Sequence, residues 1–324
     1  MVLTGEEAKD LLDLDKRIQR NFNPKDNNIV DYDRVHRTKL SSTPWIHPMI
    51  GRYSMTFYRI QKVDLRIEGA DNIPKDETVI FAMNHTDRFN YVPFQCHLWM
   101  NRKSLDHPFV TIWVKAEYYA NNFLGKVLDI CNCIPVPSKA YLTKRFFKAR
   151  WGRKPKPEEY RVIRDFVNGQ MSLDEALAQE PSSEAKYMFG FRREIHDYHP
   201  YIMRRVTEIS ANALENVGLS LIIFPEGTRS SSLGKGRTGL VQLAYQTGKK
   251  IIPVGCNGSD KVHVGNLPIA RRGSNMVYRV GEPIDPNGRL SEFKDDHEAA
   301  TEVVMSEIEN LLDEEYRRRP APPN

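Results

Sequence analysis

The stretch LSLIIFPEGTRS, residues 219–230, decides the fold class of this chain. It begins with an almost wholly apolar run, which is typical of a strand buried on both faces of a parallel sheet. The stretch TVIFAMNHTDRFN, residues 78–90, has the same plan. Polar residues follow each run directly, and ligands of α/β sheets bind outside the carboxyl ends of the strands. We therefore predict that these two loops form the functional site.

Strand-like and helix-like segments alternate around these two stretches. Further strands are predicted at 63–69, 109–114, 133–136, 251–256 and 276–284, and helices at 91–100, 116–130, 200–218, 239–250 and 295–319. Pro200 is expected near the start of its helix, and Val303, Ile308, Leu311 and Leu312 are expected on the inner face of the last one. This order predicts an α/β fold with a largely parallel mixed sheet flanked by helices.

The expected domain organisation follows from where the alternation of strands and helices begins and ends. Residues 1–62 are expected to be an N-terminal helical, membrane-surface segment, 63–316 the main domain and 317–324 a disordered tail. Residues 140–198 break the alternation and are expected to be a helical insertion. The segment 44–63 mixes aromatic, aliphatic and basic residues, and its periodicity fits a helix on a membrane surface or one packed on the domain.

Composition limits the class of protein. The 324 residues are 40% hydrophobic with a mean hydropathy of −0.54, which is enough to build a large core. No apolar run reaches the ~18 residues of a membrane span, and the N-terminus lacks the apolar middle of a signal peptide. We therefore expect a cytoplasmic protein without a transmembrane span. The CNC at 131–133 is too tight for a zinc hook, so no metal site is expected.

The positive charge of the chain is concentrated in one segment. Residues 139–164 hold ten basic side chains and two acidic ones. Such a segment fits a solvated face, or a surface that meets anionic lipid or nucleic acid. Phe146, Phe147 and Trp151 lie among the basic residues, which favours a membrane interface. No nucleic-acid motif accompanies the charge, so no nucleic-acid partner is expected.

The loop after residue 224 has the composition of an anion site. Glu226, Gly227, Thr228 and Arg229 follow the strand, and Lys235 and Arg237 come shortly before the next helix. An arginine can bind a phosphate or carboxylate with two hydrogen bonds, and a helix start also favours an anion. We therefore predict that these six residues bind the anionic part of a substrate.

The loop after residue 83 supplies a candidate base. A histidine at a strand end can act as a base near neutral pH, and His85 next to an anion site suits removal of a proton from the hydroxyl of a phosphorylated alcohol. Its ring partner is open between two residues. Asp87 can reach the ring if residues 85–87 are extended, whereas Asn90 can accept through its amide oxygen. No nucleophile elbow is present, so no acyl-enzyme intermediate is expected.

Several motifs together resemble the glycerolipid acyltransferases, the superfamily of the 1-acylglycerol-3-phosphate O-acyltransferases. These motifs are VDLRIEGADNIP, VIFAMNH, VKAEYYANNFLGKVL, LIIFPEGTRS, RTGLVQLAYQTGKKIIPV and YRVGEPI, between residues 63 and 284. The resemblance implies a glycerolipid-acyltransferase-like fold, with His85 as general base and the loop at 226–229 as the site for the phosphate and glycerol of the acceptor. The family has an aspartate where this chain has Asn90. The resemblance also implies a second phosphate contact by an arginine, for which Lys139, Lys144 or Arg145 substitutes here.

The resulting hypothesis is an O-acyltransferase of phospholipid biosynthesis. The resemblance implies transfer of a fatty acyl group from acyl-CoA or acyl carrier protein to a hydroxyl of a lysophospholipid or glycerol phosphate. The acyl donor is a co-substrate, and no other cofactor is expected. The expected partners are a phospholipid membrane surface, to which the protein is peripheral, and an acyl carrier protein. The alternative is a non-catalytic lipid-binding protein on the same fold, because Asn90 replaces the usual acid.

Overall fold

The computed structural model describes residues 32–179, 188–263 and 269–319. These residues form two compact units. The described residues of the first unit are 32–38, 114–126, 134–179 and 188–208, and those of the second are 39–113, 127–133, 209–263 and 269–319. The expected domain boundaries stay a prediction, and the two units follow a different division. Most of the expected tail, residues 320–324, and most of the expected N-terminal segment, residues 1–31, lie outside the described residues.

Seven strands of the described residues form one mixed sheet, in the order β1-β7-β6-β2-β5-β3-β4. The strands are β1 (Asp64–Glu68), β2 (Ile80–Met83), β3 (Val110–Lys115), β4 (Cys133–Val136), β5 (Ser220–Ile223), β6 (Ile251–Asn257) and β7 (Asn275–Val280). Strand β2 is parallel to β5 and β6, and β5 is parallel to β3. Strand β7 is antiparallel to β6 and parallel to β1. The predicted α/β class with a largely parallel mixed sheet is confirmed.

Burial of the strands explains their sequence patterns. Every residue of β2, β5 and β6 is buried, which is why these strands are apolar runs without alternation. Strand β1 stands at the edge of the sheet and alternates between exposed and half-buried residues. The most apolar strands therefore form the centre of the sheet, and the two polar loops follow two neighbours among them.

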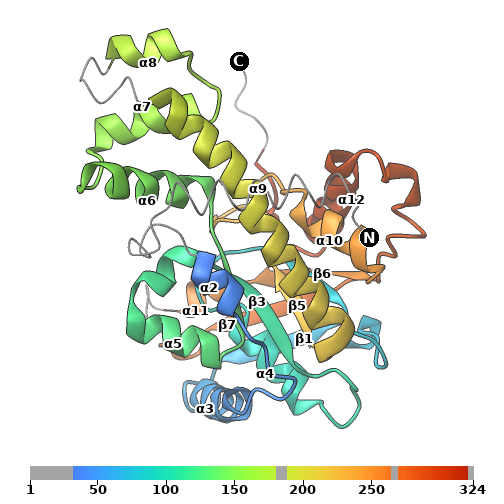
Figure 1. The fold of residues 1–324 in the computed structure, drawn as a ribbon. Coiled ribbons are helices and arrows are strands. Elements are labelled where there is room, and N and C mark those ends of the chain that lie inside the picture. The colour runs from blue at the N-terminus through green and yellow to red at the C-terminus, as the bar shows by residue number, and fades with distance from the viewer. Residues whose placement is uncertain (1–31, 180–187, 264–268, 320–324) are drawn as a thin grey trace. The chain divides into compact units, whose positions relative to one another are not determined.

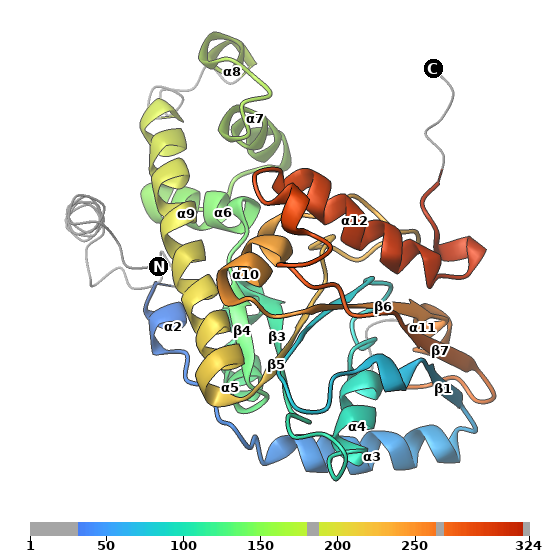
Figure 2. The same cartoon turned by 90° about the vertical axis from the view of Figure 1, so that its right-hand side faces the viewer.

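Helices of the second unit cover both faces of this sheet (Figure 2). Helices α3 (Ile46–Ile60) and α4 (Val92–Met100) lie on one side, and α10 (Gly239–Thr247) and α12 (His297–Asn310) lie on the other. Phe94 of α4 packs its ring 5.1 Å from that of Phe81 in β2. The short helix α11 (Ser259–Val262) follows β6. The site loops therefore leave a sheet whose central strands are fixed by packing on both faces.

Only part of the predicted inner face of α12 is buried. Ile308 and Leu312 are buried as expected, but Val303 and Leu311 are only half-buried. The remaining buried side chains are Ala300, Thr301, Val304 and Met305. The buried positions recur at three- and four-residue spacing, which is the stripe that a straight helix presents to a sheet.

The first unit is helical throughout most of its described length (Figure 1). Its helices are α2 (Tyr32–Arg37), α6 (Lys139–Trp151), α7 (Pro157–Val167), α8 (Leu173–Gln179) and most of α9 (Met188–Asn212). Helix α5 (Asn122–Ile130) begins in this unit and ends in the second. The helices predicted for 140–198 are thus present in the described residues of that segment.

Two details of the first unit correct the sequence-based predictions. Phe146 and Phe147 are buried, so these rings do not extend the exposed basic surface of α6. Pro200 lies inside α9 and not near its start. Ile195 and Tyr198 before the proline are buried like Ile202 after it, so one apolar stripe continues through the position. Tertiary packing of this stripe outweighs the proline's lost hydrogen bond.

Candidate active site

The two polar loops meet because their strands are parallel neighbours. Ala82 of β2 stands opposite Ile223 of β5, so both loops leave the same edge of the sheet. The backbone N–H of Ser230 donates to the carbonyl oxygen of His85 over 2.9 Å. The structure therefore brings the histidine loop and the PEGTRS loop into direct contact.

Asn90 lies on the Nδ1 side of the His85 ring. Its Oδ1 atom is 3.3 Å from Nδ1 of His85, and its Nδ2 atom donates to the carbonyl oxygen of Asn84 over 2.8 Å. The second bond fixes the amide orientation, because only the NH₂ group can donate to a carbonyl. The oxygen of Asn90 therefore faces the ring. An accepting oxygen selects the tautomer with the proton on Nδ1, in which Nε2 carries the lone pair that can accept a proton.

The loop around Asn90 is anchored to the sheet by further hydrogen bonds. Asn84 donates to the carbonyl of Cys256 over 2.9 Å and accepts from the Cys256 N–H over 2.7 Å. The hydroxyl of Tyr278 donates to the carbonyl of Asn90. Asn84, Asn90 and Tyr278 are all buried. The position of Asn90 is thus set by β6 and β7 as well as by its own loop.

Phe224 stacks on the His85 ring. The ring centroids are 3.9 Å apart and the planes are inclined by 16°. Stacking fixes the plane of the imidazole, and the bond to Asn90 fixes its rotation within that plane. The two contacts together define the direction of Nε2.

Asp87 takes part in a different network. Its Oδ1 atom accepts from the Phe89 N–H at 2.6 Å and lies 3.1 Å from Nδ1 of His263, while Oδ2 accepts from the Ser259 hydroxyl. Nε2 of His263 lies 2.9 Å from the Tyr58 hydroxyl. Both oxygens of Asp87 are therefore bonded to groups other than the His85 ring. The interpretation of Asp87 as a ring partner is corrected, because residue 87 turns toward α11 instead of running parallel to residue 85.

The charge state of Asp87 follows from this network. Burial by itself raises the pKa of Asp87, but hydrogen bonds from His263, Ser259 and the Phe89 N–H outweigh that effect. The pKa of Asp87 consequently lies below its usual range. The ionised carboxylate connects the histidine loop to α11 and, through His263, to α3.

Glu226 joins the two loops through its carboxylate. Oε2 accepts from the His85 N–H over 2.9 Å, and Oε1 accepts from the Gly234 N–H over 2.8 Å. Burial raises the pKa of Glu226, although both amide bonds favour the ionised form. Glu226 was expected among the substrate-binding residues. The structure uses both of its oxygens to position backbone, so its contribution is to hold His85 against the second loop.

The PEGTRS loop contains a tight turn at Gly227 and an exposed arginine, Arg229. Gly227 has a φ of 66°, and a Cβ atom there would lie 2.8 Å from Nε of Arg237. The same Nε donates to the carbonyl of Glu226 over 3.3 Å. Thr228 and Arg229 are exposed. Gly227 is therefore required for the turn, and Arg237 packs against the loop that bears Arg229.

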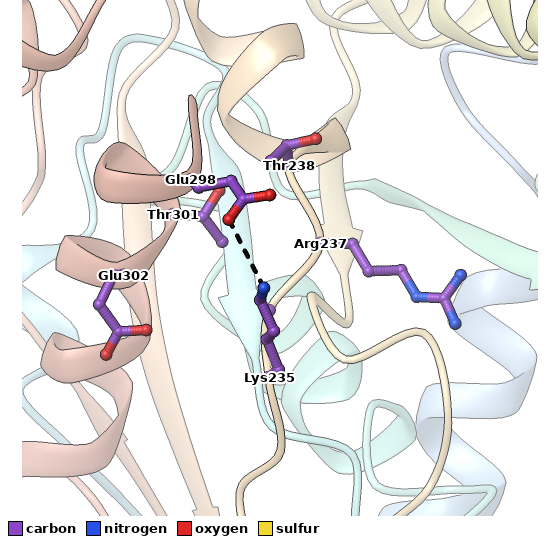
Figure 3. A pocket seen from close by; sticks show the side chains of 7 residues that line it. Lys235, Arg237, Thr238, Glu298, Thr301 and Glu302 are labelled. Atoms are coloured by element: carbon purple, nitrogen blue, oxygen red, sulfur yellow. Dashed lines mark ion pairs between the residues drawn. The ribbon is translucent and has the colours of Figure 1, made fainter. Parts of the chain in front are cut away.

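Lys235 points toward Glu298 of α12 (Figure 3). Its Nζ atom lies 3.5 Å from a carboxylate oxygen of Glu298, and Arg237 extends in another direction. A pocket of about 240 Å³ lies beside Lys235, lined by Lys235, Gly236, Arg237, Thr238, Glu298, Thr301 and Glu302. Neither His85 nor Arg229 lines it. The six predicted anion-binding residues therefore do not line one pocket. Lys235 and Arg237 line it, whereas Glu226, Gly227, Thr228 and Arg229 do not.

Lys139, the expected second phosphate contact, belongs to the first unit. It is the first residue of α6, directly after Ser138, whose hydroxyl accepts from the Tyr141 N–H over 3.1 Å. The role of Lys139 stays a prediction. Within the described residues, no group of three or more His, Cys, Asp or Glu side chains could hold a metal ion.

One comparison with known proteins covers the second loop. A family described as Acyltransferase matches residues 164–257, a stretch that contains β5, the PEGTRS loop and β6 but not His85. The resemblance to acyltransferases is thereby confirmed. No curated protein sequence matches the chain. Among solved structures, the chain is similar to the 1-acyl-sn-glycerophosphate (LPA) acyltransferase PlsC from Thermotoga maritima. The identity is 17%, the match covers 82% of this chain and 80% of that one, and the TM-score is 0.43.

Sequence reasoning missed several residues of the site. Phe224 stood inside the quoted motif, but nothing in the sequence indicated that its ring stacks on His85. Tyr58, Ser259 and His263 all lie more than 25 residues along the chain from either loop. The only available signal was the polar NGSD turn at 257–260, at the carboxyl end of a predicted central strand.

Proposed function

We propose that this protein is an O-acyltransferase that moves a fatty acyl group from a thioester donor to a hydroxyl of a phosphate-bearing glycerolipid. The donor is acyl-CoA or acyl carrier protein, and the acceptor is a lysophospholipid or glycerol phosphate. The observation that carries the proposal is the arrangement of His85. Asn90 and Phe224 hold its ring, and Glu226 fixes its backbone to the loop that bears Arg229. The family match over 164–257 supports the same class of reaction.

The reaction uses Nε2 of His85 as a general base. Nε2 accepts the proton of the acceptor hydroxyl while the hydroxyl oxygen attacks the carbonyl carbon of the thioester. The C–O bond forms, the C–S bond breaks, and the departing thiolate takes the proton from the imidazolium. His85 is then neutral again. Arg229, with help from Arg237, binds the phosphate of the acceptor and so holds the hydroxyl near Nε2.

Release of thiol tests the proposal directly. Purified protein is mixed with acyl-CoA or acyl carrier protein and with a panel of lysophospholipids and glycerol phosphate, and free thiol is measured. We expect release that depends on an acceptor and is lost in His85→Ala. His97→Ala is the matched control, because His97 lies in the last turn of α4 and its ring is 3.2 Å from the side chain of Asn101. Equal activity of His85→Ala and wild type refutes the assignment of the base.

Helix α3 supports a peripheral association with membranes. Trp45, Met49, Tyr53 and Ile60 are exposed by 63%, 58%, 72% and 64%, respectively. Their spacing places them on one side of the helix, opposite the buried His47, Gly51 and Tyr58. Arg52 and Arg59 are exposed beside this stripe. An apolar stripe with basic neighbours fits the surface of an anionic bilayer. Among the described helices, none is both long and apolar enough to cross a membrane.

Vesicle sedimentation tests this part of the proposal. The double variant Trp45→Ser, Tyr53→Ser is expected to bind vesicles that contain phosphatidic acid at least tenfold more weakly than wild type. Ile269→Ser is the control, because Ile269 is an exposed apolar residue outside α3. Equal loss of binding in the control and in the double variant contradicts a specific role of α3.

The alternative function, a non-catalytic lipid-binding protein, is favoured by one observation. Asn90 occupies the position where the family has an acid, and an amide does not neutralise an imidazolium. This alternative predicts binding to lysophospholipid vesicles without thiol release from any donor. The donor and acceptor panel above distinguishes the two functions, since release that depends on His85 excludes the alternative.

A further inference from the structure

The stack between Phe224 and His85 has a chemical consequence beyond fixing the ring. The face of a phenyl ring carries partial negative charge, and a cation placed over that face is attracted to it. The two rings are nearly parallel, with centroids 3.9 Å apart and planes inclined by 16°. A proton added to Nε2 therefore places its positive charge directly over the Phe224 face.

The attraction to Phe224 matters for the imidazolium because no carboxylate is hydrogen-bonded to Nδ1 in the contacts described above. The group there is the neutral amide of Asn90, with its Oδ1 atom 3.3 Å from Nδ1. An amide oxygen selects the tautomer but contributes less than a carboxylate to the stability of an imidazolium. Asp87, the nearest acid on the same loop, has its oxygens bonded to Ser259, Phe89 and His263.

Burial against an apolar ring also has the opposite effect, because it removes water from the charged form of a histidine. His85 and Phe224 are both half-exposed, so the loss of water is partial. An aliphatic side chain at position 224 removes a similar amount of water without offering a negative face. The difference between a phenyl and an aliphatic side chain therefore isolates the attraction.

We propose that Phe224 is a positioning residue that stabilises the imidazolium form of His85 while the proton is held on Nε2. The proposal rests on the function of His85 as general base. In this arrangement Asn90 selects the tautomer and Phe224 stabilises the charge, so two neutral side chains share the task of the family's aspartate. Phe224 acts through His85 and makes no bond to the reacting atoms.

The two site loops and the residue after α11 carry other titratable groups, which remain the same when residue 224 is changed. They are Asp87 and Arg88 on the histidine loop, Glu226, Arg229 and Arg237 on the second loop, and His263 after α11. Because wild type and the Phe224 variants share these groups, a difference between them in titration midpoint or kcat reports on the side chain at position 224 alone.

The test compares Phe224→Leu with Phe224→Tyr. Tyrosine keeps an aromatic face, whereas leucine keeps only apolar bulk. The titration of the His85 ring is followed by NMR, with His85→Ala to assign the signal, and the kinetics are measured with the thiol-release assay. We expect leucine to move the midpoint of the titration to lower pH and to lower kcat by about 3- to 30-fold, equivalent to about 0.6 to 2 kcal/mol. The KM for the acceptor is expected to stay within about twofold, and tyrosine to resemble wild type in both measurements.

Thermal unfolding confirms that each variant is folded before comparison. An unchanged titration midpoint and kcat in folded Phe224→Leu overturn the proposal, and so does a tyrosine variant that behaves like leucine. The experiment distinguishes failure of the proposed function from failure of the role of Phe224. If no thiol is released by wild type, the proposed function fails, and the NMR midpoint still decides whether Phe224 stabilises the imidazolium. If turnover is present and the midpoint does not depend on residue 224, only the role of Phe224 fails.

Discussion

Asn90→Asp places an acid beside the His85 ring, and the structure predicts that this change destabilises the protein. In wild type, Nδ2 of Asn90 donates to the carbonyl oxygen of Asn84 over 2.8 Å, and Asn90 is fully buried. An aspartate with one oxygen toward His85 turns its other oxygen toward the Asn84 carbonyl. One hydrogen bond is lost, worth about 1 kcal/mol, and a buried carbonyl is left unsatisfied at a cost of about 1 to 3 kcal/mol. The expected loss in the free energy of unfolding is therefore about 2 to 4 kcal/mol near neutral pH.

The sign of the pH dependence follows from the same geometry. A protonated aspartate can donate to the Asn84 carbonyl and restore the lost bond. We therefore expect the pKa of the introduced carboxyl group to be higher in the folded protein than in the unfolded chain. The stability of the variant relative to wild type is then greatest below the unfolded pKa and falls as the pH rises through the folded pKa. The deficit is expected to be small near pH 4 and to reach its full size near about pH 7.

Urea unfolding at several pH values measures this deficit. Asn216→Asp is the matched control, because Asn216 is exposed and a new charge there stays in water. The thiol-release assay is run in parallel. In a serine protease, an aspartate in place of asparagine behind the catalytic histidine is worth about 10⁴ in rate, and we expect no gain of that size here. An Asn90→Asp variant as stable as wild type near neutral pH, or more than about 100-fold more active, refutes the reasoning.

Three further changes test the other parts of the site. Asp87→Asn removes the charge beside His263 and is expected to lower the free energy of unfolding by about 2 to 4 kcal/mol, with kcat of the folded enzyme within about fivefold of wild type; a larger loss of kcat contradicts its structural role. Because the pKa of Asp87 is lowered, its contribution to stability is present above the unfolded value of 3.8 and is lost as the pH falls through the folded pKa. Acid unfolding of wild type and of the variant, measured side by side, tests this dependence. Glu226→Gln can accept only one of the two amide bonds, so we expect about 1 to 3 kcal/mol less stability and a loss of activity. Because burial raises the pKa of Glu226, its contribution to wild-type stability is greatest below the unfolded value of 4.5 and falls as the pH rises through the folded pKa, a slope that the variant lacks in urea unfolding. Arg229→Ala is expected to raise the KM for a phosphate-bearing acceptor by about 10- to 100-fold with a smaller change in kcat, and steady-state kinetics with an unchanged KM exclude Arg229 as the phosphate contact.

Much of the fold was readable because the hydrophobic effect leaves a pattern in the chain. The central strands are continuous apolar runs, and their burial on both faces is the reason for that pattern. Where two forces compete, the sequence was less informative. Pro200 was expected near a helix start, but the apolar stripe through Ile195 and Tyr198 carries α9 across it. Phe146 and Phe147 were expected on a membrane-facing surface, but packing buries them.

The sequence by itself located the two loops, the candidate base in one and the candidate anion-binding arginine in the other, because strand ends and side-chain chemistry are local properties. It left the ring partner of His85 open between Asp87 and Asn90, since both are close to residue 85 along the chain. Tertiary structure decided this question through distant residues. Ser259 and His263 draw Asp87 toward α11, while Asn84 and Tyr278 hold Asn90 beside the ring. Buried polar groups must be satisfied, and their partners come from wherever the fold brings them. Only the folded chain therefore shows which of the two side chains faces the imidazole.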